Sequence, residues 1–186
     1  MTTLRERAKA DRRLALLAAA ARLFAERGYD RVTLEEIGGA AGISGPAVYR
    51  HFPGKQAVLA AILLDASTGL LSGGERVIGS TPDAAEALRE LVAFHVEFAV
   101  GNAAVIRVQD RDLDSLAEPD SRRVRTLQRT YVELWVDVLA RLDPSAPVPA
   151  LRSRAHAGFG LMNSTPHSAA APRDLLAAMA LAALTA

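Results

Sequence analysis

The chain contains 186 residues with a formal net charge of +1 at neutral pH, and half of its residues are hydrophobic. This length suits one large domain or two small ones, with enough apolar side chains for a substantial core. The absence of cysteine excludes a disulfide framework, thiolate zinc sites and a cysteine nucleophile. No uninterrupted apolar run reaches the roughly 18 residues that span a membrane, and the N-terminus lacks the apolar core of a secretory signal. We therefore expect a soluble, cytoplasmic protein that does not enter a membrane.

Charge is distributed unevenly along the chain. Residues 1–55 have a net charge of +4, whereas residues 56–186 have a net charge of −3. A positive surface attracts the phosphates of nucleic acid, so the N-terminal part is where such a partner is expected. Asymmetries of this size are common, however, and this one needs a motif to support it.

Apolar residues recur at helical spacing through nearly the whole chain, and convincing alternating strands are absent. We therefore predict an all-α fold. The first helix is expected from about Asp11 to Arg27, where Gly28 ends it.

The next segment, residues 33–59, predicts two short helices joined by a tight turn, with a third helix behind them. Thr33 is expected to cap the first helix, and Glu36 completes a capping-box pattern. Gly42 supplies the residue that a turn of positive φ requires after a helix. Ser44 is expected to cap the second helix.

The second helix combines small, aromatic and basic side chains. Pro46 fits its first turn, where a missing N–H costs nothing, and Val48 and Phe52 are expected to turn inward. The surface left exposed then includes Gly45, Ala47, Tyr49, Arg50 and His51. Such a surface on a short helix behind a glycine turn fits insertion into the major groove of DNA.

This segment resembles the DNA-binding domain of the TetR family of transcriptional regulators. The matching residues are Thr33, Ile37, Ala41-Gly42-Ile43-Ser44, Tyr49, His51-Phe52, Lys55 and Leu59. Several positions at fixed spacing make the resemblance specific, and it covers the first third of the chain. Gly38 departs from the alanine usual in the family, and Pro46 departs from a frequent glycine. The resemblance implies a three-helix helix-turn-helix domain at 1–55 and a helical ligand-binding and dimerisation domain at 56–186.

The resemblance also implies which residues contact double-stranded operator DNA. Those expected at backbone phosphates are Thr33, Tyr49, His51 and Lys55, and those expected at the groove are Ser44, Gly45, Pro46, Ala47 and Arg50. Tyr49 and His51 have the alternative of packing inside the domain, and Arg50 can bond either guanine or a phosphate. Because Gly45 and Ala47 have little with which to read a base, DNA shape must supply part of the specificity. The basic arm either reaches DNA or forms a solvated, disordered tail (Arg5, Arg7, Lys9, Arg12 and Arg13).

Helical spacing continues through the rest of the chain. A long helix begins near Lys55 and is expected to fade between Gly69 and Gly74, where three glycines favour a bend or break. Further helices are expected at about 83–100, at 103–113, from 119 to a proline-rich connector at 143–149, at 150–163 and at 172–185. A polar turn is expected at 164–168.

The family resemblance implies a small-molecule effector among the middle helices. Candidate lining residues are the aromatic and polar side chains that interrupt aliphatic stripes: Phe94, His95, Phe98, Gln109, Tyr131, Trp135, Phe159, Met162 and Asn163. A buried histidine or amide needs a partner, which a ligand can provide, although ordinary core packing explains each residue equally well. Arg107 and Arg111 either anchor an anionic ligand or pair with nearby aspartates. An acyl-CoA or another lipid-like effector fits this mixture.

The last two helices are candidates for a homodimer interface. Their apolar residues are Leu151, Ala155, Phe159, Met162, Leu175, Met179, Ala180, Ala183 and Leu184. Small residues permit close helix approach across a two-fold axis. Burial of the same residues within one subunit is the alternative.

Catalysis has little support. The four histidines are dispersed without metal-ligand spacing. Ser164 and His167 lie in a polar stretch that extends to Ser168, but no nucleophile elbow accompanies them, so a turn between helices is the better interpretation. We expect no metal, no cofactor and no enzyme activity.

The sequence thus favours a homodimeric, ligand-responsive regulator of transcription, and within that class a repressor that a small hydrophobic effector releases from its operator. A transcriptional activator or an effector-independent regulator is the alternative of the same class. A helical lipid-binding protein or an enzyme is the alternative from other classes, and neither needs a basic DNA-reading motif.

Overall fold

A computed structural model describes residues 4–167 and 172–186; Ser168, assigned above to a turn, lies outside these ranges. The described residues form helices and three short 3-10 segments, without a strand. The helices are α1 (Leu4–Arg27), α2 (Leu34–Ala40), α3 (Gly45–Val48), α4 (Lys55–Ser80), α5 (Ala84–Gly101), α6 (Ala103–Asp112), α7 (Glu118–Leu142), α8 (Val148–Met162) and α9 (Arg173–Thr185). The all-α prediction is confirmed.

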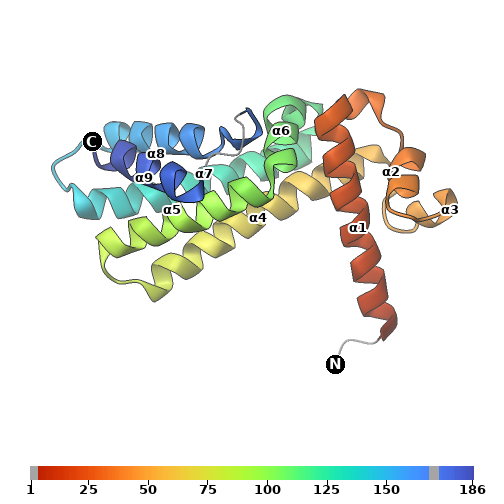
Figure 1. The fold of residues 1–186 in the computed structure, drawn as a ribbon, viewed down its shortest axis with the longest axis horizontal. Coiled ribbons are helices and arrows are strands. Elements are labelled where there is room, and N and C mark those ends of the chain that lie inside the picture. The colour runs from red at the N-terminus through yellow and green to blue at the C-terminus, as the bar shows by residue number, and fades with distance from the viewer. Residues whose placement is uncertain (1–3, 168–171) are drawn as a thin grey trace.

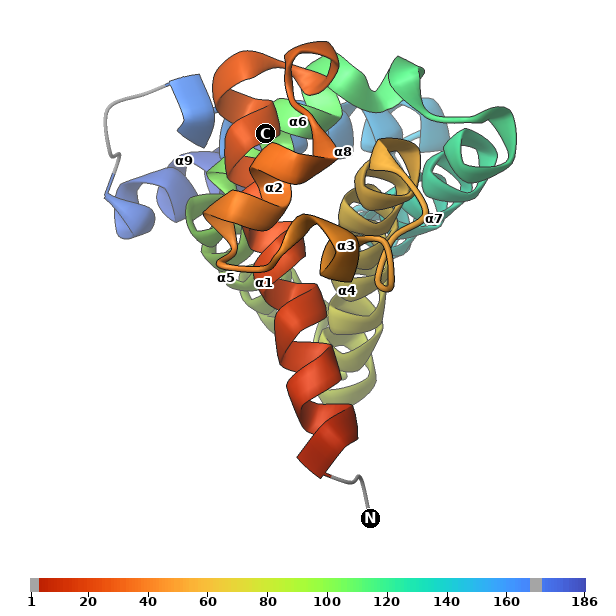
Figure 2. The same ribbon diagram turned by 90° about the vertical axis from the view of Figure 1, so that its right-hand side faces the viewer.

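We call residues 4–54, with α1 to α3, the head, and α4 to α9 the body. Figure 1 shows the body as an elongated bundle with the head at one end, and α4 runs from the head along the bundle. The N-terminal half of α1 projects away from both. Figure 2 shows α2 and α3 on the end face beside this projection.

The first helix begins at Leu4, well before the expected start at Asp11. The alternative of a disordered arm is therefore wrong for the residues from Leu4 onward. Their sequence is rich in alanine and arginine, which are both good helix formers. Because Leu4 is 86% exposed, local propensity rather than packing accounts for helix at this end.

Local signals in residues 33–44 form largely as expected. The Glu36 backbone N–H donates to Thr33 Oγ1 at 3.2 Å, and the Thr33 N–H donates to Glu36 Oε2 at 2.8 Å. The capping box is thus confirmed, as is the positive φ of Gly42, which is 66°. Ser44 occupies the N-cap of α3, but its side chain makes no capping hydrogen bond, so that detail of the prediction is wrong.

The predicted bend or break at Gly69–Gly74 is wrong, because α4 is one unbroken helix from Lys55 to Ser80. Its glycines serve packing instead. A Cβ at Gly73 would collide with the ring of Phe94 on α5, and one at Gly74 would lie 2.8 Å from Tyr131 Cε2 on α7. The missing side chains allow α5 and α7 to approach α4 closely.

By length and composition, α4 is long and apolar enough to cross a membrane. The bent pair of α5 and α6, with the 3-10 turn after α6, also meets this test if the pair is counted as one span. Half of the most apolar window of α4 is buried inside the protein. Contacts with α5, α7 and α1 occupy this helix. Its apolar character is therefore explained by its place in the core.

Two hydrophobic clusters stabilise the molecule. The first joins α1, α2, α3 and the start of α4, and it also takes in Val108, Leu116 and Val124 from the body. The second joins α5, α7, α8 and α9 around Trp135, which is fully buried. Head and body are thus connected by shared core packing as well as by the chain itself.

The close approach at Gly73 yields a stability test. Gly73→Ala is expected to lower the free energy of unfolding by about 1–3 kcal/mol, because the added methyl group must displace the Phe94 ring. Gly69→Ala on the same helix has open space around its Cβ and is expected to raise stability by about 0.5–1 kcal/mol through helix propensity. Urea unfolding monitored by circular dichroism measures both changes. Equal effects of the two substitutions would contradict the packing described here.

Candidate functional site

The exposed end of the head is built on a very short α3. Val48 is fully buried and Phe52 is 4% exposed, so the inward orientation predicted for both is confirmed. Gly38 on α2 permits this packing, because a Cβ there would lie 2.5 Å from Val48 Cγ2 and 2.9 Å from the Ile43 carbonyl oxygen. The family departure at Gly38 therefore tightens the crossing of α2 and α3.

The surface left outside by this packing contains most of the predicted groove residues. Ser44, Pro46, Tyr49 and Arg50 are exposed, and the predicted residues that are partly buried are Gly45, Ala47, His51 and Lys55. Tyr49 is 54% exposed and its hydroxyl donates to Glu35 Oε1 at 3.0 Å, which raises the pKa of Tyr49. Tyr49 thus does not pack inside the head, and its hydroxyl is held at the rim of α2 and α3.

Lys55 at the start of α4 has a structural role in the head. Its Nζ donates to the carbonyl oxygen of Tyr29 at 2.8 Å and lies 4.3 Å from the centre of the Tyr29 ring. A longer bond, of 3.4 Å, reaches the Asp30 carbonyl. An ammonium group has three N–H donors, so a third donor can still meet a phosphate beside these bonds.

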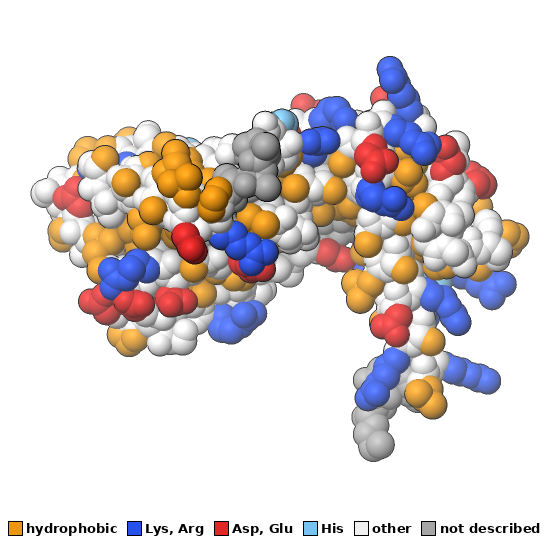
Figure 3. All heavy atoms as spheres, viewed as in Figure 1, with side chains coloured by type: hydrophobic (Ala, Val, Ile, Leu, Met, Phe, Trp, Pro, Cys, Tyr) orange, Lys and Arg blue, Asp and Glu red, His pale blue; other side chains and the backbone are white. Residues whose placement is uncertain are grey.

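A basic groove of about 620 Å³ lies between the projecting part of α1 and α3. One face of α1 supplies Arg5, Lys9 and Arg12, and the other wall includes Arg50 and His51. Partial burial lowers the pKa of His51, and the neighbouring charges of Lys9, Arg12, Arg13 and Arg50 lower it further. Figure 3 shows Lys and Arg side chains around the projecting helix. The spacing of four and three residues on α1 was the sequence signal that these side chains share a face.

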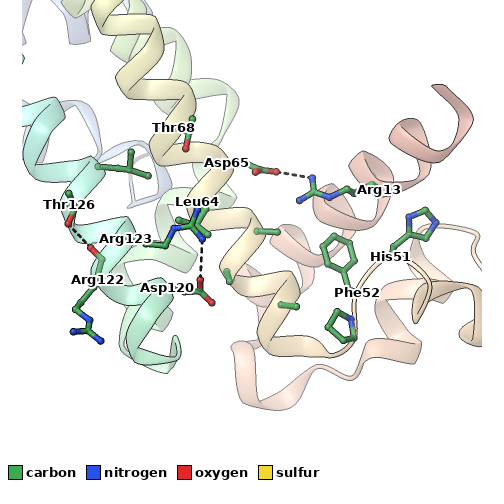
Figure 4. Close-up of a pocket in the computed structure, with 15 residues that line it drawn as sticks. Arg13, His51, Phe52, Leu64, Asp65, Thr68, Asp120, Arg122, Arg123 and Thr126 are labelled. Atoms are coloured by element: carbon green, nitrogen blue, oxygen red, sulfur yellow. Dashed lines mark hydrogen bonds and ion pairs between the residues drawn. The ribbon is translucent and has the colours of Figure 1, made fainter. Parts of the chain in front are cut away.

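A second hollow, the junction groove, separates the head from α7 and has a volume of about 780 Å³ (Figure 4). Arg13 on α1 bonds Asp65 on α4 at 3.0 Å, and its guanidinium lies 5.3 Å from the centre of the Phe52 ring. Arg123 on the opposite wall pairs with Asp120 at 3.9 Å. The Arg and Asp side chains that line this groove are therefore paired.

Arg111 on α6 forms a second connection between body and head. Its guanidinium donates to the Phe24 carbonyl near the C-terminus of α1 and pairs with the buried Asp112 at 3.0 Å. A cation there complements the partial negative charge of the helix end. Arg107 donates to the Pro166 carbonyl at 2.6 Å. Pairing with a nearby aspartate is therefore confirmed for Arg111, whereas Arg107 bonds a backbone carbonyl instead.

The His95 cavity lies in the body among α4 to α8 and has a volume of about 210 Å³. Five of the nine predicted ligand residues line it: His95, Gln109, Tyr131, Phe159 and Asn163. Trp135 packs beside them, with its ring centre 5.0 Å from that of Phe159. The sequence pattern thus gathers most of its polar and aromatic candidates around one cavity.

The remaining predicted ligand residues lie elsewhere. Phe94 packs on Gly73, and Phe98 lines a separate hollow between α1 and α4. Met162 is fully buried in the second core cluster. The helical stripe that suggested them does not distinguish a residue that faces a cavity from one that faces a neighbouring helix.

His95 is almost completely buried and both of its ring nitrogens are engaged. Nε2 lies 3.1 Å from Asn163 Oδ1, and Nδ1 lies 3.2 Å from the Tyr131 hydroxyl. An amide oxygen can only accept, so Nε2 has the proton and Tyr131 donates to Nδ1. Burial lowers the pKa of His95 to about 4, which the bond to Asn163 opposes only in part. The histidine is therefore neutral at physiological pH.

Several lining residues were not predicted: Ser67, Leu70, Gln128, Val132 and His156. Ser67 is a polar residue on the apolar side of α4, and Gln128 precedes Tyr131 by one turn of α7. A hydroxyl inside an otherwise apolar helical stripe was the available signal for Ser67. Gln128 had none, because half-exposed glutamines are common on helices.

Part of the apolar surface of the predicted dimer helices is buried in the subunit's own core. Residues buried within it are Leu151, Ala155, Met162, Ala180 and Leu184. By contrast, Leu175 and Met179 on α9 are 54% and 50% exposed, and Val148 on α8 is 50% exposed. Large apolar side chains thus remain exposed on both helices.

Two sequence-family models match the chain. The model of bacterial regulatory proteins of the tetR family matches residues 16–62, and that of tetracyclin repressor-like C-terminal domains matches residues 81–167. The chain belongs to the TetR family of bacterial regulatory proteins. The relatives described next are transcriptional regulators and not enzymes.

Two curated relatives illustrate the range of the family. The HTH-type transcriptional repressor KstR2 of Rhodococcus jostii (strain RHA1) is 33% identical over 132 residues, or 70% of this chain and 65% of that protein. The HTH-type transcriptional activator FasR of Mycolicibacterium smegmatis is 29% identical over 132 residues, or 70% of this chain and 60% of that protein. The chain therefore spans just under two thirds of the length of these relatives.

Solved structures share the fold. The TetR family regulator PfmR from Thermus thermophilus superposes with a TM-score of 0.77 at 25% identity, over 99% of this chain and 97% of that chain. AibR, crystallised in complex with isovaleryl coenzyme A and operator DNA, superposes with a TM-score of 0.79 at 17% identity, over 94% and 98% of the two chains.

The buried His95 makes stability depend on pH. Between the unfolded pKa of about 6.5 and the folded pKa of about 4, the unfolded chain binds more protons, so stability falls as the pH falls. This group contributes about 3 kcal/mol across that window. The free energy of unfolding of the natural protein is thus expected to fall by that much more than that of His95→Gln between pH 6.5 and pH 4. Urea titrations measure this difference, and parallel pH profiles would refute the assignment.

Proposed function

We propose that this chain is a homodimeric repressor of transcription in the cytoplasm, which leaves its operator when a small effector enters the His95 cavity. The observation that supports this best is the combination, in one chain, of an exposed basic surface on the head and a separate cavity in the body. The basic groove beside α3 adds positive charge where phosphates would lie.

At the operator, α3 would enter the major groove with Arg50 toward the bases. The phosphate backbone would be held by Tyr49, Thr33 and Lys55. Beside them would lie Ser44 and His51. Gly45, Pro46 and Ala47 allow close approach without reading bases themselves. Two copies related by a two-fold axis through α8 and α9 would meet half-sites about 34–36 Å apart, or a multiple of that.

The exposed apolar side chains of Val148 on α8 and of Leu175 and Met179 on α9 support dimerisation through these helices. Three large apolar side chains that are half-exposed on adjacent helices are typical of an interface. The same helices were expected to dimerise from the sequence, although five of the nine residues named there are buried within the subunit.

The size of the His95 cavity limits the effector. Its volume of about 210 Å³ is below the roughly 300–1,000 Å³ of pockets for drug-sized ligands. AibR binds isovaleryl coenzyme A, which favours an acyl-CoA here as well. In this chain, only the acyl end of such a molecule would fit inside, with the nucleotide portion outside the cavity.

Two connections can transmit effector binding to the head. Ser67 and Leu70 of the cavity belong to α4, whose first turn includes Lys55, and Gln109 belongs to α6, which bonds α1 through Arg111. An effector that moves either helix would change the spacing of the two heads. It can do so only through different affinity for the two arrangements.

An activator is the second candidate, because FasR is a transcriptional activator with similar identity to this chain. The two candidates differ in the expected effect of DNA binding on transcription, because a bound repressor blocks transcription and a bound activator raises it. Transcription in vitro from a template with the selected operator distinguishes them.

Arg50→Ala tests the DNA-reading surface. Operators are first selected from random duplexes with the natural protein. Loss of Arg50 is expected to weaken operator binding by about 1–3 kcal/mol and to reduce the preference over unrelated DNA. The control, Arg89→Ala, removes the same charge from an exposed site on α5 and is expected to change neither affinity. Competition gel shifts measure both, and unchanged operator binding by Arg50→Ala would refute the contact.

Ser67→Ile tests the effector cavity. The larger side chain fills part of the cavity and is expected to reduce the release of operator by isovaleryl coenzyme A at least tenfold, while DNA affinity without effector stays the same. Ser72→Ile, at an exposed position further along α4, is the matched control and should respond normally. Fluorescence anisotropy of labelled operator provides the measurement. A normal response of Ser67→Ile would place the effector elsewhere.

A further inference from the structure

The His95 cavity contains buried hydrogen-bond donors without partners. Ser67 Oγ and Gln128 Nε2 are both buried, both lack a hydrogen-bond partner and belong to residues that line the cavity. Ser67 as a whole is only 3% exposed. An amide nitrogen can only donate, and a hydroxyl donates as readily as it accepts. Leaving such groups unpaired is costly, so a ligand that displaces water from them must provide acceptors.

Two neighbouring polar groups of the cavity already have hydrogen-bond partners. Asn163 Oδ1 and the Tyr131 hydroxyl are both engaged by the ring of His95. Because the ring uses both nitrogens, it needs no third partner. The buried cavity atoms without a partner among the described residues are therefore Ser67 Oγ and Gln128 Nε2, and both can donate.

The cavity also lacks formal charge. Of the residues that the structure describes, none that line it is Lys, Arg, Asp or Glu. Burial keeps His95 neutral, since its pKa falls to about 4. Arg107 and Arg111 bond other groups, the Pro166 carbonyl and Asp112. His156, which also lines the cavity, is exposed, so an anionic group beside the buried Ser67 and Gln128 would have no fixed counter-charge there, which is unfavourable.

We propose that the effector is uncharged at its buried end and has a carbonyl acceptor, of a ketone, ester or thioester, that bonds Gln128 Nε2 and Ser67 Oγ. Leu70, Val132 and Phe159 contact its apolar body, and the volume of about 210 Å³ limits that body to a ring or a short chain. This inference rests on the proposed function in taking the cavity as the effector site. A free carboxylate is excluded from the cavity, whereas the thioester of the same acid is accepted.

Three probes of nearly equal size separate these possibilities: acetophenone has a carbonyl, ethylbenzene has no acceptor, and benzoate is an anion. Binding of each to the full chain is measured by calorimetry and by ligand-observed nuclear magnetic resonance, without DNA. Dissociation constants in the millimolar range are expected for such small molecules. Acetophenone is expected to bind about tenfold more tightly than ethylbenzene, and benzoate not at all. Stronger binding of benzoate, or no binding of acetophenone, would overturn the proposal.

Two variants assign the preference to the donors. Gln128→Leu and Ser67→Ala are each expected to bring acetophenone closer to ethylbenzene, and their combination to make the two equal, while ethylbenzene binds as before. Thr68→Ala, at an exposed position on α4, is the control and should keep the tenfold preference. If Gln128→Leu does not fold, Ser67→Ala alone decides, because removal of one hydroxyl from a helix is a small change. An undiminished preference in Ser67→Ala would overturn the role of these donors.

The readouts keep this inference separate from the proposed function. Discrimination between the probes without any effect of acetophenone-type ligands on operator binding would support the carbonyl site and refute the effector role of the cavity. Release of the operator by a carboxylate that binds in the cavity would support the effector role of the cavity and refute the carbonyl site. The two outcomes are distinguishable because one experiment measures ligand binding alone and the other measures DNA.

Discussion

The continuous helix α4 is the constraint on which the rest of the molecule depends. Its first half packs in the core of the head through Val58, Leu59 and Leu63, and its second half lies against α5 and α7 through Gly73 and Gly74. Because the two glycines let the neighbouring helices come close, the body holds α4 firmly. A rigid element shared by two cores can transmit a displacement, whereas a bent or broken one would absorb it.

Which features could be predicted from the sequence depends on how local they are. The capping box of Thr33 and Glu36 and the positive φ of Gly42 need only adjacent backbone, and both form as expected. The role of Gly73 depends on Phe94 from another helix, so propensity alone wrongly indicated a break. Ser67 and Gln128 can be recognised as cavity residues only when α4, α5 and α7 are placed around one cavity. The spacing of residues within one helix does not show this arrangement.

The distribution of charge matches the two tasks proposed for the chain. Cationic side chains gather on the exposed faces of α1 and α3, where water screens them until phosphate approaches. The His95 cavity, by contrast, is lined by neutral groups with a buried histidine that stays unprotonated. A neutral cavity selects by hydrogen bonding and shape, so binding there need not disturb the field that attracts DNA.

One polar contact between head and body is weak enough for a small effector to alter, although the two parts also share core packing. The Arg13–Asp65 pair is about half exposed on both sides, and such pairs contribute about 0.2–1 kcal/mol. Typical couplings between two sites are about 1–3 kcal/mol, which a few hydrogen bonds and a buried ring can supply. The core packing shared with α6 and the bond from Arg111 to the Phe24 carbonyl are the firmer contacts, so the head is expected to turn about its contact with α6 while the junction groove changes width.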